Sequence, residues 1–148
     1  MKSRPTANIR LRDNEGRREV FDIVRNRFVA LTPEEWVRQH AIHWLHYDLG
    51  YPLELIQVEG AITLNGMTRR CDIVVYDENV NPLIIVECKN ETVTLTQKVL
   101  DQACRYNLVL QVPYLCLTNG EQQVFCRVDF EEKRVVKILK LPNYHKKS

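Results

Sequence analysis

The chain has 148 residues, which is enough for one domain with its own hydrophobic core. Hydrophobic residues make up 45% and charged residues 27%, and no apolar run approaches the roughly 20 residues that a membrane-spanning helix needs. The net charge of +2 is unevenly distributed: residues 1–30 and 131–148 are basic, whereas residues 31–130 hold seven Lys/Arg against thirteen Asp/Glu. This pattern suits a cation-binding site flanked by phosphate-contacting surfaces, although solvated basic tails would produce it too.

The five cysteines are scattered, and no two have the Cys-x-x-Cys spacing of a zinc site. An odd number of cysteines, lying mostly in apolar runs, is typical of reduced core residues rather than of a disulfide framework. The start of the chain has no apolar segment and does not resemble a signal peptide. The sequence therefore predicts a cytoplasmic protein.

The N-terminal residues 1–18 are polar and rich in arginine, and we expect them to form a basic, flexible segment. Within it, Asn14-Glu15-Gly16 is typical of a turn. A short strand is predicted over Glu19–Val24. One domain is expected from residue 19 to residue 148.

The clearest helix signal follows. Thr32 is a typical N-cap, Pro33 suits the first helical position, and Glu35 completes a Thr-x-x-Glu capping box. The helix is predicted from Pro33 to Asp48, because Gly50 and a proline beyond it are stop signals.

Three strands are predicted next. They cover Leu55–Leu64, Arg69–Tyr76 and Leu83–Lys89, and Asn65-Gly66 between the first two is a strong hairpin turn. The third strand is almost continuously apolar before Glu87, as is typical of a strand buried on both faces.

A second helix is predicted over Leu95–Leu110 with Thr94 as its cap. Further strands are predicted over Tyr114–Leu117, Gln123–Phe130 and Arg134–Leu141. This order predicts an α/β fold: an αβββαβ core with a central mixed sheet flanked by helices, plus extra C-terminal strands.

Three charged residues in the strand region indicate a chemistry. Asp72 lies on the second strand, and Glu87 and Lys89 close the third, where alternation puts both on one face about 7 Å apart. Two neighbouring carboxylates repel each other unless a cation lies between them. A divalent metal beside a lysine indicates phosphodiester hydrolysis. The alternative is an ordinary cross-strand ion pair between Glu87 and Lys89, with Asp72 in a turn.

The arrangement of these motifs resembles the PD-(D/E)XK nuclease superfamily: Asp72, then Glu87-x-Lys89, then Gln102-x-x-x-Tyr106 on the second helix. Leu31–Gln39, Val86–Lys89 and Tyr114–Gly120 are similar to the N-terminal nuclease domain of type I restriction-enzyme R subunits. The similarity covers roughly residues 19 to 126. Cys71 stands where the superfamily name has proline. The sequence has no Gly-x-x-x-x-Gly-Lys phosphate loop, so we expect a stand-alone nuclease module without a helicase motor.

The resemblance implies a restriction-type DNA nuclease that uses Mg²⁺ or Mn²⁺. Asp72, Glu87 and the main-chain carbonyl of Cys88 would bind the metal, and Lys89 would orient or deprotonate the attacking water or stabilise charge on the phosphate. Gln102 and Tyr106 share a helix face beside this site. Taken alone, that pair is better explained by an ordinary amphipathic helix, with Tyr106 in the core and Gln102 facing water.

The first helix offers two acids. Glu34 is expected on the same stripe as Val37, Ala41 and Leu45, which makes it a candidate additional metal ligand, whereas Glu35 is explained by the capping box. Both acids also favour a helix N-terminus electrostatically.

The expected partners are DNA, a second copy of the chain (since cutting both strands takes two active sites) and a further restriction-system subunit. A catalytically silent module that binds nucleic acid or protein is the alternative function. Target specificity, strand preference and endo- versus exonuclease action stay open.

Overall fold

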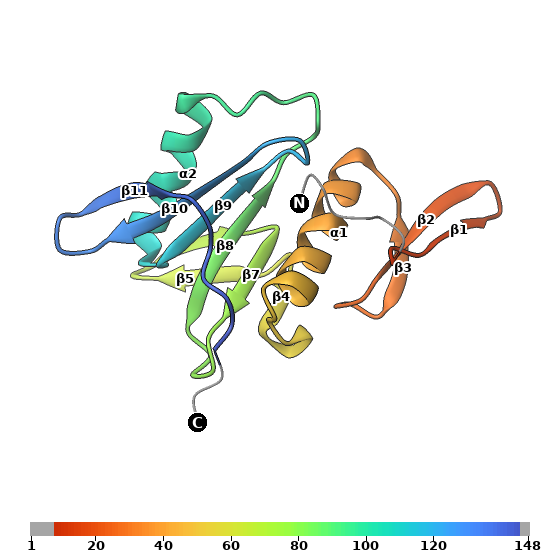
Figure 1. Ribbon diagram of the computed structural model, residues 1–148, viewed down its shortest axis with the longest axis horizontal. Coiled ribbons are helices and arrows are strands. Elements are labelled where there is room, and N and C mark those ends of the chain that lie inside the picture. The colour runs from red at the N-terminus through yellow and green to blue at the C-terminus, as the bar shows by residue number, and fades with distance from the viewer. Residues whose placement is uncertain (1–7, 146–148) are drawn as a thin grey trace.

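The computed structural model describes residues 8–145, which fold into two α-helices, a π-helical turn, a short 3₁₀ helix (Leu53–Leu55) and three β-sheets (Figure 1). The first sheet is antiparallel and contains β1 (Leu11–Asn14), β2 (Arg17–Asp22) and β3 (Arg27–Ala30). Residues 11–14 and 17–18, which belong to the segment expected to be flexible, pair as strands; residues 1–7 lie outside the described part. The turn predicted at Asn14-Glu15-Gly16 is confirmed, with positive φ at Glu15 and Gly16.

The first helix begins and ends where its signals indicated. α1 covers Pro33–His43, and the Thr32 hydroxyl accepts a hydrogen bond of 3.0 Å from the Glu35 N–H. Its last turn, Trp44–Asp48, is π-helical, and Gly50 follows with φ of +83°. No helix among residues 8–145 has the length and apolar character needed to cross a membrane.

The central sheet contains six strands in the order β11-β10-β9-β8-β7-β4. These strands are β4 (Ile56–Val58), β7 (Ile73–Tyr76), β8 (Pro82–Cys88), β9 (Tyr114–Thr118), β10 (Gln123–Asp129) and β11 (Arg134–Ile138). β8 and β9 are parallel, and the other neighbours are antiparallel. The predicted mixed sheet with added C-terminal strands is confirmed.

The two helices cover opposite faces of this sheet (Figure 1). α1 packs with Val86 and other residues of one face, whereas α2 (Gln97–Leu110) packs with Ile85 and other residues of the opposite face. α2 starts two residues later than predicted, and its cap is Thr96 rather than Thr94, because the Thr96 hydroxyl accepts the Val99 N–H.

Two of the predicted strands are interrupted. The chain predicted as Leu55–Leu64 forms β4 and β5 (Ala61–Leu64), and Arg69–Tyr76 contains part of β6 (Met67–Arg70) and β7. The breaks face each other: the Glu59 N–H donates to the Asp72 carbonyl, and the Cys71 N–H donates to the Gly60 carbonyl. Glu59 has φ of +56°, a left-handed conformation that a continuous strand does not contain. β5 and β6 therefore leave the central sheet as a separate hairpin.

The turn of this hairpin is the predicted Asn65-Gly66. Its residues have φ of 51° and 80°, as a two-residue type I′ turn requires. Replacing Gly66 with alanine is expected to lower the free energy of unfolding by roughly 1 kcal/mol, because a Cβ disfavours the left-handed region. Asn65→Gly keeps the turn geometry and is the matched control. Urea denaturation that gives equal stabilities for Gly66→Ala and wild type would contradict this expectation.

Candidate functional site

The candidate site lies where β7 begins and β8 ends. Ile73 pairs with Val86, so the antiparallel register places Asp72 opposite Glu87. The Asp72 Oδ2 atom accepts a hydrogen bond of 2.7 Å from the Cys88 N–H. This bond fixes one carboxylate beside the end of the strand that carries the other.

Glu87 is largely removed from water, with 8% of its surface exposed. Burial raises the pKa of its carboxyl group, the Arg69 guanidinium opposes that rise, and the charge of Asp72 adds to it. Lys89 also opposes the rise, more weakly than Arg69. Asp72, Glu87 and Lys89 are therefore close enough to interact electrostatically, as the strand pattern predicted.

Lys89 follows directly after β8. Its N–H donates to the Thr118 carbonyl at 2.8 Å, which continues the β8–β9 ladder by one residue and keeps the main chain extended there. Its side chain is half-buried. The alternation of side chains consequently places Lys89 on the same side of the sheet as Glu87.

Glu87 forms its ion pair with Arg69, an arginine of β6. The Arg69 Nη2 atom lies 2.6 Å from Glu87 Oε1, and its Cζ atom lies 3.9 Å from the centre of the Tyr106 ring. Tyr106 of α2 is thus connected to the carboxylate site through a stacked guanidinium. The hydrogen-bonded ion-pair partner of Glu87 is therefore Arg69, whereas the alternative considered from the sequence named Lys89.

Gln102 and Tyr106 share one face of α2, as their spacing predicts. Both line an open groove on that helix together with four other residues: Met67, Lys98, Arg105 and Val109. Gln102 is exposed, whereas Tyr106 is half-buried. Two cationic side chains in this groove make it attractive for phosphate groups.

The expectation that Glu34 shares the buried stripe of the first helix is wrong. Glu34 is exposed, whereas Glu35 is 5% exposed, because helix α1 turns Glu35 toward the first sheet rather than toward solvent. Glu35 belongs to a cluster that we call the buried ion network, made of Asp22, Arg25, Glu35, Arg38 and Gln39. The exposed position of Glu34 does not support a role as a metal ligand.

The buried ion network extends toward the candidate site through Arg38. Burial lowers the pKa of Arg38, but its hydrogen bonds and charge interaction with Glu35 outweigh this effect, and the charge of Asp72 contributes to the same rise. Arg38 also lies 3.4 Å from Glu59, at the strand break beside Asp72. Each carboxylate of the pair therefore has an arginine near it: Arg38 near Asp72 and Arg69 near Glu87.

Sequence reasoning missed Arg69 and Arg38. On a continuous strand, the side chains of Arg69 and Asp72 would point to opposite faces, because the two positions are three apart, an odd number. The break at residues 71–72 changes this alternation, and Cys71 and Val74 consequently pack in the same cluster. Cys71 and Val74 are three positions apart, and two apolar residues at an odd spacing on one face indicate a break in the strand.

The donor set fits a hard divalent cation. Two carboxylates and a main-chain carbonyl supply the oxygen ligands that Mg²⁺ prefers, and water usually completes its coordination. The Arg69 guanidinium shows that Glu87 already accepts a cation at this position. Across residues 8–145, no three side chains of His, Cys, Asp or Glu gather into a metal site, so the set rests on these two carboxylates.

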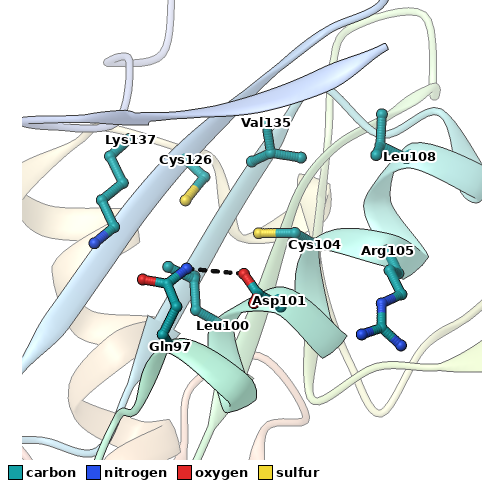
Figure 2. A pocket seen from close by; sticks show the side chains of 9 residues that line it. All are labelled: Gln97, Leu100, Asp101, Cys104, Arg105, Leu108, Cys126, Val135 and Lys137. Atoms are coloured by element: carbon teal, nitrogen blue, oxygen red, sulfur yellow. Dashed lines mark hydrogen bonds between the residues drawn. The ribbon is translucent and has the colours of Figure 1, made fainter.

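A second pocket lies elsewhere on α2. Figure 2 shows it between α2 and strands β10 and β11, with Cys104 and Cys126 inside it and a hydrogen bond of 2.8 Å between Gln97 and Asp101. None of the candidate site residues lines it.

Comparisons with known proteins identify the family of this chain. The sequence model of the family described as "Type I restriction enzyme R protein N terminus" matches residues 33–142, three quarters of the chain. The chain belongs to this family. The match includes the carboxylate pair, Lys89, and the α2 motif, whereas the first sheet precedes it.

The fold of this chain is similar to that of a solved structure. A fragment described as "a putative HsdR subunit of a type I restriction enzyme from Vibrio vulnificus YJ016" superposes with a TM-score of 0.52 at 17% identity. The superposition covers 76% of this chain and 24% of the other, so this chain spans about a quarter of that protein. A search of curated proteins gives no significant match.

Proposed function

We propose that this family member is a Mg²⁺- or Mn²⁺-dependent DNA nuclease of the PD-(D/E)XK type. The observation that carries the proposal is the placement of Asp72 opposite Glu87 at the end of β8, with Lys89 next along the chain. Membership of a restriction-enzyme family supports DNA as the substrate.

Each residue has a distinct part in this proposal. Asp72, Glu87 and the Cys88 carbonyl hold the metal. When bound, the metal polarises the scissile phosphate and lowers the pKa of a water molecule. Lys89 orients that water, accepts its proton, or stabilises negative charge on the phosphate. Gln102 and Tyr106, in the groove on α2, hold the substrate backbone beside the reacting phosphate.

The test is a cleavage assay on supercoiled plasmid and on single-stranded DNA, with Mg²⁺, Mn²⁺ or EDTA. Wild type should cut only with metal, and Lys89→Ala should be slower by roughly 10²–10⁴-fold, the usual contribution of a positioned acid–base group. Lys140→Ala, at an exposed lysine outside the site, is the control and should cut like wild type. Equal rates for Lys89→Ala and wild type, or cleavage in EDTA, would contradict the mechanism.

The alternative is a module that binds DNA without cutting it. The direct ion pair between Arg69 and Glu87 favours this alternative, because it satisfies the carboxylate without metal. Salt-sensitive DNA binding by folded wild type, with no cleavage under any divalent metal, would establish it. Cleavage that appears only with another restriction subunit would instead identify a partner-dependent nuclease.

We also propose that the protein acts in the cytoplasm, where it would encounter DNA. A homodimer would supply one active site for each DNA strand.

A further inference from the structure

Arg69 occupies an unusual position between a carboxylate and an aromatic ring. Its guanidinium lies 2.6 Å from Glu87 Oε1 and 3.9 Å from the centre of the Tyr106 ring, and 22% of its side chain is exposed. It comes from β6, a strand outside the central sheet. Three elements (β6, β8 and α2) therefore meet at this one side chain.

The same Glu87 carboxylate is the proposed metal ligand. A guanidinium and a divalent cation repel each other, and both seek the lone pairs of this carboxylate. Glu87 is too deeply buried to remain without a cation at low cost, which explains why Arg69 holds it here. Metal binding must then compete with this ion pair.

We propose that Arg69 is a positioning residue that holds Glu87 until a divalent cation takes the carboxylate, and that its guanidinium then binds a phosphate of the DNA. This inference rests on the proposed function. It adds a regulation of metal binding and a substrate contact that neither the Asp-Glu-x-Lys set nor the Gln-x-x-x-Tyr motif contains.

The chemistry of arginine suits both states. A guanidinium is flat and always charged, stacks on aromatic rings, and offers paired donors that match a carboxylate or a phosphate. The Tyr106 ring keeps the guanidinium oriented when its carboxylate partner is lost. Lys98 and Arg105 line the adjacent groove beside Tyr106, so a phosphate released into this region meets further positive charge.

Arg70 provides a matched comparison. It is the next residue of β6, is 75% exposed at its side chain, and lies 3.5 Å from Glu59 rather than Glu87. It has the same charge and nearly the same position in the chain, but it contacts no proposed ligand. A general effect of removing positive charge from β6 should appear equally at Arg70.

The first measurement is Mn²⁺ binding without DNA, by isothermal titration calorimetry. Arg69→Gln should bind Mn²⁺ about tenfold more tightly than wild type, a change equivalent to about 1.4 kcal/mol, because the competing cation is gone. Arg70→Gln should bind Mn²⁺ like wild type. Equal or weaker Mn²⁺ binding by a folded Arg69→Gln would overturn the competition.

The second measurement is DNA binding with Mn²⁺ present, in a Lys89→Ala background whose cleavage is slow compared with binding. Adding Arg69→Gln should weaken binding and reduce the slope of log affinity against log salt concentration by about one, the signature of one lost phosphate contact. An unchanged slope would overturn the phosphate contact.

Two results separate this inference from the proposed function. If wild type and Arg69→Gln bind Mn²⁺ equally and both cut DNA, the inference fails and the nuclease stands. If neither binds Mn²⁺, the proposed metal site fails and the inference fails with it. If Arg69→Gln does not fold, Arg69→Lys is measured in its place. This variant keeps the competing positive charge, so its Mn²⁺ affinity should match that of wild type. Tighter Mn²⁺ binding by Arg69→Lys would contradict the proposal.

Discussion

Replacing Asp72 with asparagine is expected to slow metal-dependent cleavage by roughly a thousandfold or more, because a bound metal supplies several kcal/mol of transition-state stabilisation. The fold should survive, since an amide oxygen can still accept the Cys88 N–H that the Asp72 carboxylate accepts at 2.7 Å. The loss would therefore come from one negative charge and not from a changed strand pairing.

The measurement combines cleavage rates, Mn²⁺ titration and thermal unfolding of the same preparation. Asp101→Asn is the control, because Asp101 of α2 is exposed and bonds to Gln97 in the other pocket. Wild-type Mn²⁺ affinity in Asp72→Asn would remove Asp72 from the ligand set. Wild-type cleavage would contradict the proposed mechanism.

The second large effect concerns stability. Arg25→Met is expected to lower the free energy of unfolding by about 3–5 kcal/mol, because removing one partner of a buried ion pair leaves the other charge unpaired. The Arg25 side chain lies 2.7 Å from Asp22, which is fully buried, and 3.0 Å from Glu35, which is nearly so. The hydrophobic replacement keeps most of the side-chain volume.

Arg27→Met is the matched control. Arg27 lies on β3 and is exposed, so its loss should change stability by no more than about 0.5 kcal/mol. Urea unfolding of both variants at neutral pH makes the comparison. Equal stabilities for Arg25→Met and Arg27→Met would show that the buried ion network contributes little to folding.

The network also determines how stability depends on pH. Burial opposes ionisation of Asp22 and Glu35, but hydrogen bonds and ion pairs with arginine outweigh it, so the pKa of each carboxyl group is below its ordinary value of 3.8 or 4.5. As the pH falls, these carboxyl groups consequently bind protons in the unfolded chain at a higher pH than in the folded protein. The stabilisation is complete above these ordinary values and is lost as the pH falls through the lowered ones. Glu35→Gln should therefore flatten the acid limb of the stability profile.

Local signals in the sequence predicted most of the elements. Thr32-Pro33 and Asn65-Gly66 specify a helix start and a hairpin turn through their own backbone preferences, so they could be interpreted without knowledge of distant residues. The placement of Asp72 and Glu87 on successive strands followed from the strand pattern, and the common face of Glu87 and Lys89 followed from a period of two. These features needed no information beyond their neighbours in the chain.

The remaining features depend on contacts between distant parts of the chain. Two predicted strands are broken where hydrogen bonds link Glu59 to Asp72 and Gly60 to Cys71. The residue types at these positions do not strongly indicate a break. The same break reverses the side-chain alternation and brings Arg69 to Glu87. Metal binding and the roles of Lys89 and Gln102 stay predictions, because they concern groups and reactions that geometry alone does not test.

Glu35 shows how a local explanation can hide a tertiary one. Its N–H does bond to Thr32, as a helix cap should. Its carboxylate, however, accepts hydrogen bonds from Arg25, ten residues earlier, and from Arg38 and Gln39. The capping motif therefore appeared to explain a residue whose burial comes from a partner on another element.

The buried ion network has a consequence for where this protein can be shortened. The family match starts at residue 33, directly before α1, yet Glu35 and Gln39 of α1 have bonding partners in Asp22 and Arg25. A truncation at residue 33 would remove the partners of these polar side chains on α1, the helix that covers one face of the central sheet. We therefore expect a fragment that begins at residue 33 to be less stable than one that also contains Asp22 and Arg25.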